Sequence, residues 1–343
     1  MYRAMPEPSR EMNVRAAKAA LAHAASLGVT SVQDNSAIDA LPTYQQIRAE
    51  GGLLARINVW RPSAMKSLIA SGVRSGLGDD WIRIGAIKIL SDGSMGAGTA
   101  AFFEPYTDEP TTSGLLLYPV EELNQMIDEA DAAGFQLAVH AIGDRANALV
   151  LDAFEKTAGS RPKTDRRFRI EHSQVVRRAD LARYAKLRVV ASIQPSHCID
   201  DMRWAPKRIG AARCRMAYNF KSFLDAGIPV AFGTDWFVEP LDPRIGLYAA
   251  VTRETLEGGP KDGFFPEERI SLEDAIDLYT RGSAYAEFAD GRKGTLEPGH
   301  LADLAVFAAD LFKLPPKSLL TTPVDLTIVG GRIVFERAGV SRP

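Results

Sequence analysis

FQLAVHAIGDRA, residues 135–146, joins a strand-like apolar run to a polar end and a tight turn. The apolar run ends on His140, and the turn-forming residues Gly143 and Asp144 follow within four positions. A helical segment with one apolar stripe, residues 120–133, precedes it. Helix, glycine, buried strand and polar strand end are the parts of one unit of a parallel α/β fold.

The same unit occurs elsewhere in the chain. Besides DAAGFQLAVH (131–140), it is found in AASLGVTSVQD (24–34) and in LDAGIPVAFGTD (224–235). Gly28, Gly134 and Gly227 stand where a helix takes a left-handed C-terminal cap. The repetition predicts alternating helices and strands rather than an isolated motif.

Four further segments have the nearly continuous apolar pattern of parallel strands that are covered on both faces. They are ARINVWR (55–61), IRIGAIKILSDG (82–93), RFRIEHSQ (167–174) and RVVASIQPSH (188–197). This gives seven strands in strand–helix order, whereas a TIM barrel of the (β/α)8 type has eight. We therefore predict an α/β TIM barrel over residues 1–290 with its first strand, expected before residue 12, missing.

The C-terminal residues have a different pattern. Residues 291–310 and 324–340 contain short strands and turns, including a Gly-Gly hairpin signal at 330–331. We predict that residues 291–343 form part of a small β-sandwich domain, a C-terminal β appendage to the barrel.

Composition narrows the possible functions. The chain has 343 residues, with 41 basic against 43 acidic residues, for a net charge of −2. This balance argues against binding to nucleic acid or to an anionic membrane surface. Two cysteines and no apolar run near the roughly 18 residues of a membrane span favour a cytoplasmic protein. A small-molecule substrate is expected, and exposed strand edges of an incomplete barrel favour a homo-oligomer.

Polar side chains at strand ends mark the expected active site, because barrel enzymes place their sites at the carboxyl ends of the strands. Three of the five histidines fall at such ends. Two neutral imidazoles and a carboxylate suit zinc, which lowers the pKa of a bound water to about 7. Asp235 is the candidate general base and acid. The strand-end residues are Lys88, Asp92, His140, His172, His197 and Asp235.

Six separated motifs together resemble the amidohydrolase superfamily, in its amidohydrolase-3 branch, which includes N-substituted formamide deformylase. They are IKILSDGSMGAGTAAF, HAIGDRA, RIEHSQ, QPSH, GTDW and GTLEPGHLADLAVF, in the order of the family. The resemblance spans residues 12–340 and implies a metal-dependent hydrolase of non-peptide carbon–nitrogen bonds, with one or two zinc ions. It implies a carboxylated, metal-bridging Lys88, metal ligands His140 and His172, and Asp235 as ligand and proton carrier.

One departure from the family pattern is clear. The family's first strand carries an HxH motif, and this sequence has none. His23 lies mid-helix and cannot replace it. This departure leaves open a catalytically silent or truncated barrel, and a Schiff-base lyase that uses Lys88 as nucleophile is a further alternative. His197, Asp92 and Trp236 are predicted to contact substrate, although His197 and Trp236 could equally serve surface loops.

Overall fold

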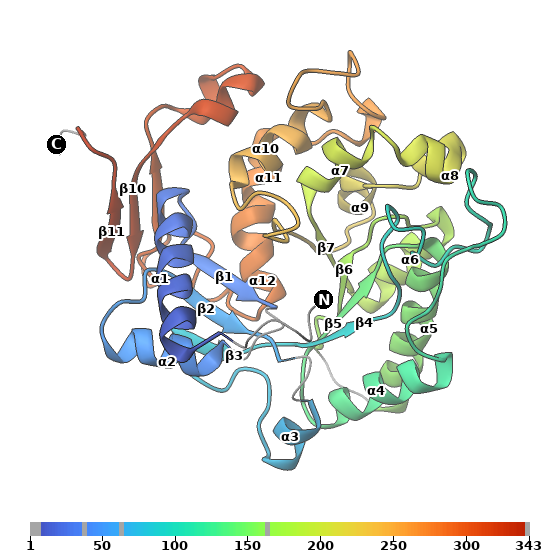
Figure 1. The fold of residues 1–343 in the computed structure, drawn as a ribbon, viewed down its shortest axis with the longest axis horizontal. Coiled ribbons are helices and arrows are strands. Elements are labelled where there is room, and N and C mark those ends of the chain that lie inside the picture. The colour runs from blue at the N-terminus through green and yellow to red at the C-terminus, as the bar shows by residue number, and fades with distance from the viewer. Residues whose placement is uncertain (1–7, 36–39, 62–64, 162–164, 340–343) are drawn as a thin grey trace.

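The protein is described by a computed structural model over residues 8–35, 40–61, 65–161 and 165–339. Its centre contains two parallel sheets, one in the order β1-β2-β3 and one in the order β4-β5-β6-β7-β8. Figure 1 shows helices around the outside of these strands, with α4, α5 and α6 along the five-stranded sheet. The predicted α/β fold with parallel strands is therefore present.

Each of the seven predicted segments contains at least one strand. The strands of the two parallel sheets are β1 (Ser31–Asp34), β2 (Arg56–Val59), β3 (Ile82–Ile84), β4 (Ile87–Leu90), β5 (Leu137–Ala141), β6 (Arg169–His172), β7 (Val190–Ile193) and β8 (Val230–Phe232). The helices are α1 (Arg10–Ser26), α2 (Leu41–Ala49), α3 (Met65–Ala70), α4 (Val120–Ala132), α5 (Asp144–Ser160), α6 (Arg178–Leu187), α7 (Pro195–Asp201), α8 (Ala205–Cys214), α9 (Phe220–Asp225), α10 (Pro243–Thr252), α11 (Leu272–Asp277) and α12 (Ser283–Ala286).

The predicted strand at 82–93 is divided into β3 and β4. β3 pairs with β2 and β4 pairs with β5, so this one segment links the two sheets. Gly85 lies at the division, where an added Cβ would stand only 1.6 Å from Asn58 Oδ1. The bare backbone can therefore approach β2 closely, and Gly85 N donates to Val59 O at 2.8 Å.

The outer edges of β1 and β8 are not paired with each other in the part of the chain that the structure describes. Gln33 of β1 donates its side-chain amide to Ser283 O at 3.1 Å. The Ser283 hydroxyl in turn donates to Phe232 O of β8 at 2.8 Å. The first residue of α12 thus bridges the two edge strands. That the predicted first strand of the barrel would lie between β1 and β8 remains a prediction.

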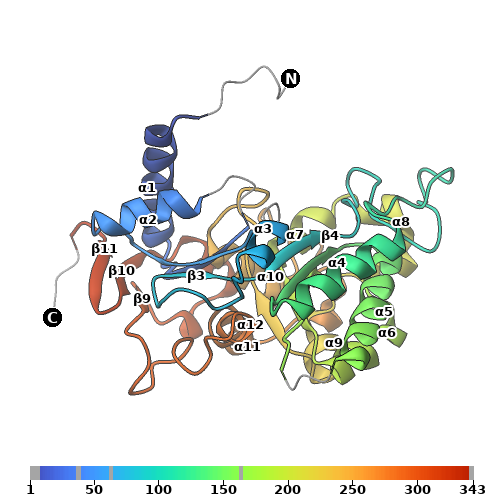
Figure 2. The same ribbon diagram turned by 90° about the horizontal axis from the view of Figure 1, so that it is seen from below.

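A three-stranded antiparallel sheet forms the C-terminal part, in the order β11-β10-β9, with β9 (Leu304–Phe307), β10 (Val324–Val329) and β11 (Arg332–Glu336). The predicted Gly-Gly hairpin joins β10 to β11, and Gly330 and Gly331 have φ of 58° and 74°. Both values suit the hairpin turn that glycine favours. The buried Thr327 hydroxyl donates to Ala25 O of α1 at 2.6 Å. Figure 2 shows this sheet beside α1, and its status as a separate domain stays a prediction.

None of the helices in the described ranges is both long and apolar enough to cross a lipid bilayer.

Candidate metal centre

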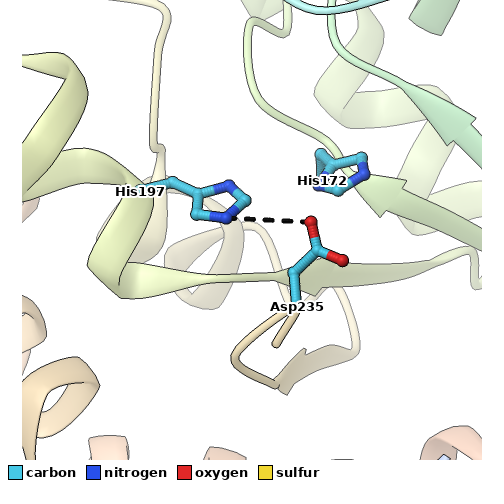
Figure 3. A group of neighbouring side chains, drawn as sticks. All are labelled: His172, His197 and Asp235. Carbon is cyan, nitrogen blue, oxygen red and sulfur yellow. Dashed lines mark ion pairs between the residues drawn. The ribbon is translucent and has the colours of Figure 1, made fainter. Parts of the chain in front are cut away.

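Three side chains that lie at or just after the carboxyl ends of strands point toward one another (Figure 3). His172 ends β6, His197 lies in the first turn of α7, and Asp235 follows β8 by three residues. One possible ligand atom from each residue lies within 4.8 Å of those from the other two. Among the described residues this is the group of histidine and carboxylate side chains that is arranged to hold a metal ion.

His172 is oriented by a neighbour on the next strand end. Its Nδ1 lies 2.7 Å from Gln194 Oε1, so Nδ1 carries the proton and donates it, because an amide oxygen can only accept. The lone pair of Nε2 is then available as a ligand. Burial, the largest cause, and the neighbouring His140 hold the pKa of His172 well below its usual value. The imidazole is therefore neutral, which is the form that binds metals.

His197 carries an unpartnered polar atom. Its Nε2 is buried and has no hydrogen-bond partner among the described residues, although Asp235 Oδ2 lies 3.8 Å away. Burial is the main cause that lowers the pKa of His197 to about 4. A buried nitrogen without a partner is costly in a folded protein and points to a missing ligand. The sequence predicted His197 as a rim residue that contacts substrate, whereas the structure brings it into the cluster.

Asp235 lies at the open side of the cluster, with its side chain 36% exposed. Burial of the carboxyl is the largest cause of its raised pKa, and the positive charge of Lys88 opposes the rise. Asp235 and His172 both have left-handed backbones, with φ of 55° and 73°. Non-glycine residues adopt this region rarely, and such strain is concentrated at functional sites.

His140 stands against the cluster without being one of its three members. Its ring centroid lies 4.5 Å from that of His172 in an edge-to-face arrangement. His140 Nε2 lies 3.1 Å from Gly93 O and 3.3 Å from Asp92 Oδ1. Both neighbours are acceptors, so Nε2 carries a proton and is not available as a ligand. His140 can thus supply a ligand only through Nδ1.

Asp92 has a different surrounding from the one expected of a substrate contact. The residue is 1% exposed. Its carboxylate accepts hydrogen bonds from Ala101 N at 2.9 Å, Ile142 N at 3.1 Å and Gly143 N at 2.9 Å. These bonds and the His140 contact occupy both oxygens. Contact of Asp92 with substrate stays a prediction, and in this structure its carboxylate lies where it can orient His140.

Lys88 lies on β4 and is 9% exposed. Burial is the largest cause of its lowered pKa, which the carboxylates of Glu171 and Asp235 partly offset. The Glu171 carboxylate is already paired, because it forms a buried ion pair with Arg169 at 2.9 Å. No hydrogen bond or ion pair within the described ranges engages the Lys88 amine.

Trp236 follows Asp235 directly and is 47% exposed. Its ring lies 6.1 Å from that of His23, near the C-terminal end of α1. Contact of Trp236 with substrate remains a prediction. The sequence reasoning missed Gln194, although its position directly after β7 in QPSH was a usable signal.

Comparison with known proteins identifies the family of this chain. Residues 1–335 match the amidohydrolase family. Protein LONG AFTER FAR-RED 3 of Arabidopsis thaliana is 37% identical over 259 residues, which are 75% of this chain and 44% of that protein. YtcJ of Bacillus subtilis is 34% identical over 262 residues, 76% of this chain and 49% of that protein. N-substituted formamide deformylase of Arthrobacter pascens is 27% identical over 264 residues, 75% and 47% of the two chains.

The fold has solved relatives as well. The crystal structure of an uncharacterized metal-dependent hydrolase from Pyrococcus horikoshii has a TM-score of 0.81 and 33% identity, covering 90% of this chain and 62% of that one. The chain spans about half the length of the curated relatives that it matches. The family match over nearly the whole sequence and the barrel-type arrangement of parallel strands lead to one conclusion: this chain belongs to the amidohydrolase family.

Proposed function

We propose that this chain carries the metal site of a hydrolase that cleaves a non-peptide carbon–nitrogen bond, of the amide or formamide kind. The observation that carries the proposal is the buried His197 Nε2, which lacks a hydrogen bond to any described residue and faces the His172 and Asp235 side chains. Two neutral imidazoles and a carboxylate form a donor set that suits zinc or a similar divalent ion. When bound, such an ion would polarise the scissile carbonyl and activate a water molecule.

Each residue has a distinct task in this proposal. His172, held by Gln194, and His197 offer neutral nitrogen ligands. Asp235 is exposed enough to reach substrate, and its raised pKa makes it a stronger base than an ordinary aspartate. It would accept a proton from the attacking water and deliver it to the leaving nitrogen.

Lys88 and His140 would extend the site. Burial lowers the pKa of Lys88, which favours the neutral amine, and the neutral amine is the form that can react with carbon dioxide to give a carbamate. In that form Lys88 would provide oxygen ligands, and His140 Nδ1 would provide a nitrogen ligand beside them. We propose this as the route to a second metal position.

The same neutral amine supports one competing function, a Schiff-base lyase with Lys88 as nucleophile. Borohydride reduction in the presence of a carbonyl substrate would trap a covalent adduct on Lys88 in a lyase. No adduct is expected in a hydrolase. A catalytically silent barrel is a third candidate, supported by the edges of β1 and β8, which do not pair with each other within the described residues.

Metal content and hydrolysis of N-formyl amines and simple amides test the proposal together. Stoichiometric zinc is expected in the purified chain, with loss in His172→Ala and reduced occupancy in His140→Ala. His300→Ala is a matched control, because His300 lies in the C-terminal part and contacts Thr295. A folded wild-type chain that takes up no metal from excess zinc would overturn the proposal. Metal without hydrolysis of any amide would favour the silent barrel.

A further inference from the structure

A buried polar group beside the candidate metal centre has no part in the proposed hydrolysis. Gln174 Nε2 donates to Asp201 Oδ2 at 2.8 Å and lies 2.7 Å from the Tyr218 hydroxyl oxygen. The Tyr218 hydroxyl donates to the same oxygen of Asp201. Gln174 is 4% and Tyr218 2% exposed. We call Gln174, Asp201 and Tyr218 the α7 clamp.

The α7 clamp connects the two elements that carry the histidine ligands. His197 and Asp201 lie four residues apart on α7 and therefore project from the same side of this helix. His197 faces His172, with ring centroids 5.8 Å apart. Asp201 contacts Gln174, which follows His172 by two residues. α7 thus contacts the end of β6 through the His197 ring and is hydrogen-bonded through Asp201 to the segment that follows β6.

The clamp is itself anchored in the backbone. Tyr218 N donates to Gln174 O at 2.9 Å, and Val175 forms a bridge with Ala217. The position of the Tyr218 ring is therefore tied to the segment that leaves β6. Asp201 cannot move away from β6 without breaking bonds to two side chains that are fixed there.

A helix as short as α7 needs such contacts. A helix of seven residues is not stable by itself in water, so its orientation is set by tertiary contacts. On its other side α7 packs through Ile199 against the apolar Tyr248 and Ala249 of α10. The hydrophobic effect that favours this packing is non-directional, whereas the hydrogen bonds of Asp201 are directional and further restrict the rotation of α7. Burial raises the pKa of Asp201 to about 7, which shows that keeping a carboxylate here is costly.

We propose that the α7 clamp is a positioning device, which sets the rotation of α7 and so holds His197 Nε2 opposite His172 and Asp235. This inference rests on the proposed function, because it takes His197 as a metal ligand. The residues of the clamp do not touch the metal; they act through His197. Mutation of residues that orient a metal ligand typically lowers metal affinity by about tenfold to a hundredfold.

Cobalt(II) titration of the full chain tests the proposal, since its visible absorption reports the number and geometry of ligands. Tyr218→Phe and Gln174→Leu are expected to weaken Co²⁺ binding by about tenfold to a hundredfold. They should also shift the spectrum toward that of His197→Gln. Asp201→Asn keeps an oxygen that can accept both hydrogen bonds, so it should retain most of the affinity and the wild-type spectrum.

Thr327→Val is the matched control. It also removes one buried hydroxyl hydrogen bond, but in the C-terminal sheet, and should leave the Co²⁺ spectrum unchanged. Folding of each variant is checked by circular dichroism before titration. If Tyr218→Phe and Gln174→Leu bind as wild type while His197→Gln binds weakly, the clamp is overturned and the proposed function stands. If wild type binds no Co²⁺, or His197→Gln binds as wild type, the clamp also fails, and in the first case the proposed function fails with it.

Discussion

Replacement of Asp92 by asparagine gives the sharpest test of the role that the structure assigns to this residue. Oδ2 accepts from the backbone of Ala101 and Gly143, and Oδ1 accepts from Ile142 N beside His140 Nε2. An asparagine has only one accepting oxygen. Whichever way the amide is oriented, its NH2 group replaces one of the two accepting oxygens. At least one of the three backbone N–H groups then loses its acceptor.

The expected loss of stability follows from the number of backbone N–H groups that lose their acceptor. Leaving one buried donor unsatisfied costs about 1–3 kcal/mol, and bonds to a charged acceptor are the stronger ones. Asp92→Asn orphans one or two backbone donors, so we expect a loss of about 2–4 kcal/mol in the free energy of unfolding. Asp92→Ala orphans all three, and the loss should exceed that of Asp92→Asn.

Urea denaturation followed by circular dichroism measures this loss. Asp152→Asn is the control: that carboxylate is 62% exposed and pairs with Arg183, and exposed pairs of this kind contribute about 0–1 kcal/mol. If Asp92→Asn were as stable as wild type and changed only the KM for an amide substrate, the structural role would be wrong. The original expectation of a substrate contact would then be right.

Four further outcomes are expected. Glu171→Gln leaves the buried Arg169 guanidinium without its anion and should lower the free energy of unfolding by about 3–5 kcal/mol in the same urea assay; a loss below 1 kcal/mol would contradict the buried pair. The folded-state pKa of His197, about 4, lies below the ordinary imidazole value of 6.5, so the unfolded chain takes up its proton first on acidification. Stability of the metal-free chain should therefore fall between pH 6.5 and pH 4, and the fall should be smaller in His197→Gln; equal pH profiles from urea titrations would count against the buried neutral imidazole. Lys88→Met removes a buried amine that has no hydrogen bond or ion pair within the described residues, so the urea midpoint of unfolding should stay the same or rise while any second metal equivalent is lost. Loss of the first metal equivalent, measured by elemental analysis, would instead assign Lys88 to the cluster of His172, His197 and Asp235. Gln194→Leu frees His172 Nδ1 and should weaken zinc binding by about tenfold to a hundredfold in a competition titration, and unchanged affinity would show that the amide does not orient the ring.

The sequence by itself determined the strands and the side of the molecule on which the site lies. Apolar runs that end on His140, His172 and Asp235 are local signals, and a parallel sheet brings the carboxyl ends of its strands to one side whatever the loops do. Glycines after helices, as at Gly28 and Gly134, have φ of 81° and 83° because only glycine adopts this cap without cost. These features depend on neighbours along the chain, so they can be read without a structure.

Only the tertiary structure decided which polar residues lie together and which are enclosed. Asp92 and Asp235 are both aspartates that follow a strand. Asp92 is enclosed by backbone N–H groups that lie 9 to 51 residues away along the chain, whereas the Asp235 side chain is 36% exposed. His197 lies in the cluster because α7 packs near the end of β6, where the His197 ring stacks on that of His172 and Asp201 is hydrogen-bonded to Gln174 and Tyr218. Hydrogen-bond partners, burial and ring contacts between distant segments depend on how these segments pack, and no local pattern of residues predicts that packing.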